Sequence, residues 1–173
     1  MINHNQNHNQ PFFFITGAPI LELGAATGAM SVFLRLPPFS LEIHTSDIDD
    51  GGDVQANIAH NFALNGLEPV RHIPHTWGTG WRDSCQRAGV DCFRYKYVIA
   101  SDILLYVSAY PALVQTLVEL FAMMQPDAEF FMVWNRRIAA SQQFFALMQG
   151  AGFCCVHHGE CIYTFSLSPP VAA

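Results

Sequence analysis

The chain has 173 residues, of which 51% are hydrophobic and only 13% are charged, and its formal net charge is −6. The apolar content is enough for a sizeable core and excludes a disordered chain, while the acidic balance argues against a nucleic-acid-binding surface. No apolar run approaches the roughly 20 residues of a membrane span, so we expect neither a nucleic-acid partner nor a membrane.

The five cysteines occur without CxxC spacing, and their number is odd. Such cysteines are typical of reduced, mostly buried thiols in an intracellular protein. The N-terminus is polar and has no basic stretch before an apolar run, so it does not resemble a signal peptide. These features predict a cytoplasmic protein, with the nucleus as a second location.

Strand-like and helix-like stretches alternate along the chain after an Asn/Gln/His tract at residues 1–10, which is predicted to be a disordered lead-in. Apolar runs predict strands at Phe12–Ile15, Ala18–Leu23, Leu41–Thr45, Val70–Ile73, Tyr95–Ala100 and Glu129–Trp134. Helical periodicity, ended by proline or glycine, predicts helices at Thr27–Leu36, Asp53–Asn65, Ala109–Met124 and Ile138–Gly150. The last two strands, joined by a turn, are predicted as a hairpin at Phe153–His157 and Cys161–Phe165.

This alternation predicts an α/β fold with a doubly wound, mostly parallel, Rossmann-like sheet and a C-terminal antiparallel hairpin. No internal repeat or linker divides residues 11–173, so we predict a single domain there. Sheets of this kind bind ligands at the carboxyl ends of their strands, and candidate site residues are therefore expected where the strands end.

The first of these strand ends is a loop of small residues, Glu22-Leu23-Gly24-Ala25-Ala26-Thr27-Gly28. Such a loop lets backbone N–H groups approach a nucleoside, and Asp47, about 20 residues on, can accept hydrogen bonds from its ribose. The carboxylate of Glu22 would repel a pyrophosphate but attract the sulfonium and ammonium groups of S-adenosylmethionine. We therefore predict S-adenosylmethionine as the cofactor, bound by Glu22, Gly24, Ala26, Gly28 and Asp47. Asp53 is expected to cap the next helix.

Ser101 and Asp102 end the fourth predicted strand. A carboxylate there can bind the donor's ammonium group or orient a substrate amine, and the alternative is a cap for the following helix. We predict a donor contact for Ser101 and a catalytic role for Asp102. His72 and His75 have no cysteine or carboxylate at metal-ligand spacing, so we expect structural histidines and no metal site.

Five stretches together resemble the family-16 methyltransferases, which are seven-strand, S-adenosylmethionine-dependent enzymes. The matching stretches are 21–28 (LELGAATG), 45–66 (TSDIDDGGDVQANIAHNFALNG), 75–78 (HTWG), 100–113 (ASDILLYVSAYPAL) and 133–153 (VWNRRIAASQQFFALMQGAGF). The resemblance implies methylation of a lysine on a protein, such as a translation factor or a chaperone. It also implies that Trp77 packs against the adenine. We expect the protein to be a monomer.

The chain departs from the family in two places. The family has a helical segment before the first strand that covers the donor, whereas here that strand begins near residue 18, so the resemblance implies a shortened N-terminus. The family's acidic–x–x–aromatic signature has one extra residue here, with Tyr106 following Asp102. Tyr106 is predicted to form part of the wall of the substrate-lysine channel.

Two alternative functions remain open. One is a small-molecule N-methyltransferase that acts on a nicotinamide-like amine. The other is a catalytically weak donor-binding or partner-binding protein, because the N-terminal cover is short. A nicotinamide-dinucleotide oxidoreductase is disfavoured, since the loop lacks the GxGxxG order and Glu22 would face phosphate.

Overall fold

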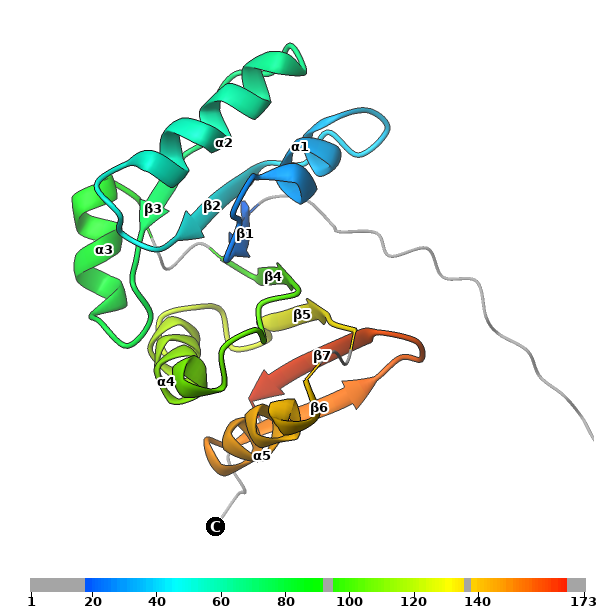
Figure 1. The fold of residues 1–173 in the computed structure, drawn as a ribbon. Coiled ribbons are helices and arrows are strands. Elements are labelled where there is room, and N and C mark those ends of the chain that lie inside the picture. Colours follow the sequence, from blue (N-terminus) through cyan, green and yellow to red (C-terminus); the bar gives the residue numbers. More distant parts are fainter. Residues whose placement is uncertain (1–17, 92–94, 136–137, 168–173) are drawn as a thin grey trace, which may run out of the picture.

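The computed structural model describes residues 18–91, 95–135 and 138–167 (Figure 1). The expected lead-in at residues 1–10 and the expected strand Phe12–Ile15 lie outside the described residues. Seven strands form one sheet in the order β3-β2-β1-β4-β5-β7-β6. The strands are β1 (Ile20–Leu23), β2 (Ile43–Asp47), β3 (His72–Pro74), β4 (Tyr97–Ser101), β5 (Glu129–Val133), β6 (Phe153–His157) and β7 (Ile162–Leu167).

The pairing within the sheet confirms the predicted fold class. Strands β1 to β5 run parallel, with Leu21 opposite His44 on one side and Val98 on the other. β7 is antiparallel to both β5 and β6, so the chain closes with the expected hairpin. β1 lies between β2 and β4, and the strand order reverses there, which is the place where such sheets bind ligands.

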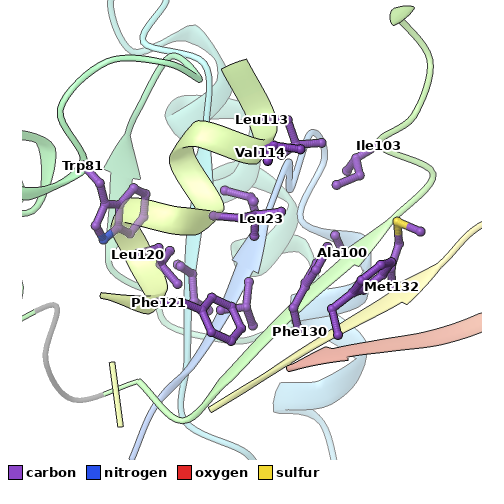
Figure 2. Close-up of a cluster of buried hydrophobic side chains, with 14 of the residues drawn as sticks. Leu23, Trp81, Ala100, Ile103, Leu113, Val114, Leu120, Phe121, Phe130 and Met132 are labelled. Carbon is purple, nitrogen blue, oxygen red and sulfur yellow. The ribbon is translucent and has the colours of Figure 1, made fainter. Parts of the chain in front are cut away.

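Helices cover the sheet on both faces (Figure 1). They are α1 (Ala29–Arg35), α2 (Asp53–Leu64), α3 (Trp81–Ala88), α4 (Tyr110–Phe121) and α5 (Gln142–Gly150), with short 3-10 turns at Val107–Ala109 and Ala139–Ser141. The larger core joins one sheet face to α3, α4 and α5. Figure 2 shows its members from β1, β4, β5 and α4: Leu23, Ala100, Phe130, Met132, Leu113, Val114, Leu120 and Phe121. The other face packs Ile20, Ile43 and Ile99 against α1.

Two elements differ from the sequence expectation. Helix α3 was not predicted, although Trp81, Ser84 and Cys85 are buried at helical spacing and Gly89, with φ of 63°, ends the helix. β3 includes Pro74, whereas the predicted strand ended before it. β3 is an edge strand, so a proline without a backbone N–H costs no ladder hydrogen bond there.

The chain's single lysine lies at the amino ends of the parallel strands. Lys96 precedes β4, and its Nζ lies 2.7 Å from the carboxylate of Asp127, which precedes β5. This pair therefore sits at the amino ends of the parallel strands, and the candidate site residues follow their carboxyl ends.

Candidate functional site

A cavity of about 370 Å³ opens beside the carboxyl end of β2. The end of β2, the loop after β3 and the segment that leads into α4 supply its lining residues: Asp47, Ile48, His75, Thr76, Trp77, Tyr106, Ala109 and Ala112. Its volume falls within the range of roughly 300–1,000 Å³ that is usual for small-molecule sites. The structure therefore places three of the predicted residues, Asp47, Trp77 and Tyr106, in one cavity.

The small-residue loop after β1 has the backbone conformation that its composition suggests. Gly24, Ala26 and Gly28 have φ angles of 71°, 49° and 72°. A Cβ on Gly28 would lie 3.0 Å from Cγ2 of Ile58, so glycine lets α1 and α2 pack closely. A Cβ on Gly24 would lie 2.8 Å from Cγ2 of Ile103. The loop is therefore restricted to small residues by its neighbours and by its left-handed turns.

Asp47 connects this loop to the cavity. One of its carboxylate oxygens accepts the N–H of Ala26 at 2.7 Å, and the other accepts the N–H of Ile48 at 2.7 Å. The carboxylate is thus fixed at the end of β2. Each carboxylate oxygen has a second lone pair, so both can still accept a hydroxyl of a ligand in the cavity.

Glu22 is buried within β1, next to the small-residue loop. It is 4% exposed, and its carboxylate accepts hydrogen bonds from the N–H and the hydroxyl of Ser31, in the first turns of α1. Burial raises the pKa of Glu22 to about 7, against the lowering effect of the Ser31 hydrogen bonds. Glu22 is absent from the cavity lining, and its predicted contact with the donor stays a prediction.

Ser101 and Asp102 lie at the end of β4. Ser101 is paired with Val133 of β5 and is exposed, and the N–H of Asp102 donates to the carbonyl of Val133 at 3.0 Å. Asp102 has a φ of 54°, a left-handed conformation that aspartate adopts more readily than most residues. Neither residue is among those that line the cavity, and their predicted roles stay predictions.

The extra residue in the acidic–x–x–aromatic signature has a structural consequence. Ile103 and Leu104 are buried, whereas Leu105 is 49% and Tyr106 72% exposed. The backbone carbonyl of Leu104 accepts the hydroxyl of Tyr110, which anchors this turn to the start of α4. Tyr106 reaches the cavity from here, whereas Leu105 is not among the residues that line it.

The aspartates after β2 have separate roles. Asp50 caps α2, because its carboxylate accepts the N–H of Gly52 at 3.1 Å and that of Val54 at 3.1 Å. The expectation that Asp53 caps this helix is wrong: Asp53 is the first helical residue, and its side chain makes no cap hydrogen bond. Asn61 of α2 donates to the carbonyl of Thr27 at 2.9 Å and so supports the loop after β1.

The buried histidines make hydrogen bonds with hydroxyl groups. Nδ1 of His72 lies 3.0 Å from Oγ1 of Thr45, and the two ring nitrogens of His75 each lie 3.0 Å from a hydroxyl oxygen, those of Ser84 and Thr116. These contacts agree with the expectation of structural histidines, and the expected absence of a metal stays a prediction. In the described part of the chain, no three His, Cys, Asp or Glu side chains are grouped as metal ligands. No helix among the same residues has the length and apolar character needed to cross a bilayer.

A family model described as lysine methyltransferase matches residues 2–151. Among solved structures, the ribosomal protein L11 methylase of Lactobacillus delbrueckii subsp. bulgaricus has a TM-score of 0.57 and 14% identity, over 88% of this chain and 70% of its own. A methyltransferase of Pyrococcus furiosus has a TM-score of 0.59 and 15% identity, over 86% and 73%. LepI, solved in complex with SAM, has a TM-score of 0.59 and 14% identity, over 90% and 44%. The chain thus spans between 44% and 73% of these proteins.

Proposed function

This chain belongs to the lysine methyltransferase family, and on that premise we propose that it binds S-adenosylmethionine in the cavity beside β2 and transfers its methyl group to an amine. The family match confirms the resemblance stated from the sequence, and with it the class of enzyme and its methyl donor. The residues that bind the donor, the acceptor and the cellular setting are proposals.

The observation that carries this proposal is the position of Asp47. Its carboxylate is held by two backbone N–H groups at the end of β2 and lines a cavity together with the ring of Trp77. A fixed carboxylate suits the two hydroxyls of a ribose, and a flat aromatic wall suits an adenine ring. The chemistry of these two residues therefore fits S-adenosylmethionine, and the loop from Gly24 to Gly28 adjoins them.

The bound sulfonium supplies an activated methyl group, so the protein's own contribution is alignment, desolvation and control of the amine's proton. We propose that Asp102 orients the acceptor amine, because it follows β4, next to β1 in the sheet. Tyr106 reaches the cavity from the same loop and forms the wall along which the acceptor enters. A lysine acceptor must lose a proton before it attacks the methyl group. A carboxylate beside the amine can accept a hydrogen bond from it and so hold it in position.

We propose that the acceptor is a lysine of a protein, such as a translation factor or a chaperone. The chain's net charge of −6 suits a basic partner. Next to the cavity, a hollow of about 240 Å³ shares Thr76 with it and presents the carboxylates of Asp49 and Asp83 beside Arg87. We further propose a monomer that works in the cytoplasm, with the nucleus as a second location.

Calorimetric titration of the purified chain with S-adenosylmethionine, S-adenosylhomocysteine and NAD tests donor binding. We expect both sulfur ligands to bind and NAD to bind far more weakly. Tighter binding of NAD than of S-adenosylhomocysteine would overturn the proposed donor. Gel filtration of the same sample tests the monomer.

A radiolabel assay tests the acceptor. The chain is incubated with labelled S-adenosylmethionine and either a cell lysate or nicotinamide, and hydrolysed protein is examined for methyllysine. We expect methyllysine in a lysate protein, and much less of it with Asp102→Ala than with the control Asp127→Ala, whose carboxylate lies at the amino ends of the parallel strands. Label in nicotinamide would identify a small-molecule enzyme instead. Donor binding without any labelled product would indicate a non-catalytic donor-binding protein.

A further inference from the structure

The loop that carries Trp77 is held by a buried chain of hydrogen bonds. His75, which follows β3, is 1% exposed, and its backbone N–H donates to the carbonyl of Asp47 at 2.7 Å. This bond extends the pairing of β2 and β3 by one residue at the cavity edge. His75 therefore joins the proposed ribose-binding strand end directly to the loop of the proposed adenine wall.

The side chain of His75 bridges two helices. Its Nδ1 lies 3.0 Å from Oγ of Ser84 in α3, and its Nε2 lies 3.0 Å from Oγ1 of Thr116 in α4. Its ring also packs edge-on against Trp81, with 4.9 Å between the ring centroids. Burial lowers the pKa of His75 to about 4, so the ring is neutral at physiological pH.

The two hydroxyls pass these bonds on to the loop between Trp77 and Trp81. Oγ1 of Thr116 accepts the N–H of Gly78 at 3.0 Å, and Oγ of Ser84 donates to the carbonyl of Gly80 at 3.4 Å. When the proton of His75 is assigned to Nδ1, His75 donates to Ser84 and accepts from the hydroxyl of Thr116. Each hydrogen bond in the chain then has one donor and one acceptor. The network therefore binds the loop at two positions, Gly78, which directly follows Trp77, and Gly80.

The loop also rests closely on α4. Gly78 has a φ of 84°, and a Cβ there would lie 3.0 Å from Cβ of Ala112. Cζ2 of Trp77 reaches to 3.7 Å from where a Cβ on Gly24 would lie, so the ring spans the distance from the loop to the donor-loop glycine. A small shift of Gly78 relative to α4 would thus move the wall of the cavity.

We propose that His75 is a positioning residue for donor binding, which acts through the hydroxyl of Thr116 to hold Gly78 and thereby the Trp77 ring. This inference rests on the proposed binding of S-adenosylmethionine beside Asp47 and Trp77. A buried donor and acceptor that lose their partner are costly, so the loop gives up its position when the bridging hydroxyl is removed.

The test compares two substitutions at one position. Thr116→Val keeps the shape of the side chain but removes the hydroxyl, whereas Thr116→Ser keeps the hydroxyl. We expect Thr116→Val to weaken the binding of S-adenosylhomocysteine about tenfold. The binding of 5′-methylthioadenosine, which lacks the amino-acid part, should weaken by the same factor. Thr116→Ser should restore affinity to within about twofold of the wild type.

A matched control separates positioning from stability. Thr45→Val breaks the equivalent buried bond between Oγ1 of Thr45 and Nδ1 of His72, also 3.0 Å long, which does not reach the loop at 76–80. We expect Thr45→Val to lower the midpoint of thermal unfolding about as much as Thr116→Val, with donor affinity unchanged. If Thr116→Val does not fold, Ser84→Ala tests the other end of the network and should weaken the binding of both ligands several-fold.

The outcomes also separate this inference from the proposed function. Absence of wild-type donor binding would overturn both. Wild-type binding that is lost in Asp47→Ala but kept in folded Thr116→Val or Ser84→Ala would overturn the positioning role alone. Equal losses in Thr116→Val and Thr45→Val would also overturn it, because the effect would then follow stability.

Discussion

The two halves of the sheet bury different kinds of side chain. Around β1, β2 and β3 the buried residues include many polar ones: Glu22, Ser31, His44, Thr45, Ser46, His72, His75 and Ser84. Around β5, β6 and β7 the buried set is dominated by aromatic rings. Phe165 alone has Phe130, Phe144 and Phe145 within 6 Å, measured between ring centroids.

The two kinds of buried side chain contribute differently to stability and to donor binding. Hydrogen bonds between buried polar groups fix geometry, because each group has few ways to be satisfied, but their net contribution to stability is modest. Aromatic packing contributes more to stability and is less demanding in direction. We therefore expect substitutions in the C-terminal half to unfold the protein and substitutions in the N-terminal half to change donor binding.

The largest effect is expected for Phe165→Ala. The side chain is fully buried, so its removal should leave a cavity and lower the free energy of unfolding by about 3–5 kcal/mol. Urea denaturation measures this loss. Phe33→Ala is the control, because Phe33 is 58% exposed, and it should cost much less. A loss below that of Phe33→Ala would contradict the assignment of stability to the aromatic half.

Glu22→Gln should show a pH-dependent effect. The folded-state pKa of about 7 lies above the unfolded value near 4.5, so the folded state holds a proton that the unfolded state releases between these values. The contribution of Glu22 to stability is thus full below pH 4.5 and is lost as the pH rises through 7. Relative to Glu22→Gln, the wild type should lose about 2–3 kcal/mol between pH 4.5 and 8.

Urea denaturation of both proteins at pH 4.5 and 8 measures this difference. The contributions of all other titratable groups are the same in the two proteins and cancel. Glu42→Gln, at an exposed position, is the control and should follow the wild type. A constant difference between wild type and Glu22→Gln over this range would show that folding does not raise the pKa of Glu22.

Asp47→Ala should weaken donor binding by roughly 1–3 kcal/mol, because the ribose hydroxyls lose charge-assisted hydrogen bonds. Its effect on unfolding should be smaller, since Asp47 lies at a strand end and is only partly buried. Calorimetry with S-adenosylhomocysteine measures the affinity, and Asp49→Ala, whose carboxylate lies 3.7 Å from Arg87, is the control. Wild-type affinity in Asp47→Ala would reassign the ribose contact to Asp49 or Asp50.

The smallest effect concerns the start of α2. Asp50→Ala removes the side-chain cap and should lower the free energy of unfolding by about 1 kcal/mol, whereas Asp53→Ala should cost only about 0.3 kcal/mol through the helix dipole. Thermal unfolding of both variants measures the difference. A larger loss of stability in Asp53→Ala than in Asp50→Ala would show that Asp53 caps the helix.

The sequence predicted the sheet and its hairpin because those signals are local. The apolar runs at Phe153–His157 and Glu129–Trp134 have strand length, and β6 has the bounds that were expected. The small residues at Gly24 and Gly28 are dictated by the loop's own backbone. Asp47 could be placed because a strand end is readable from the apolar run before it.

The remainder depends on contacts between distant residues. The partner of His75 at Nε2 is Thr116, 41 residues away, and no local pattern pairs them. Helix α3 has only eight residues, between Gly80 and Gly89, and no helix was predicted there. The hydrogen bonds that Ser31, nine residues on, donates to the carboxylate of Glu22 were also not predicted, because no local pattern pairs these two residues.

The position of Lys96 makes the protein convenient to handle. It is the single lysine of the chain, and it lies at the amino ends of the parallel strands, opposite the proposed donor cavity. Amine-directed reagents can therefore modify only one lysine side chain, and once the α-amino group is blocked the protein can be tethered to a sensor surface there, with the cavity facing solution. In the lysate assay the same scarcity keeps self-labelling low, and methyllysine recovered after hydrolysis reports on the acceptor protein.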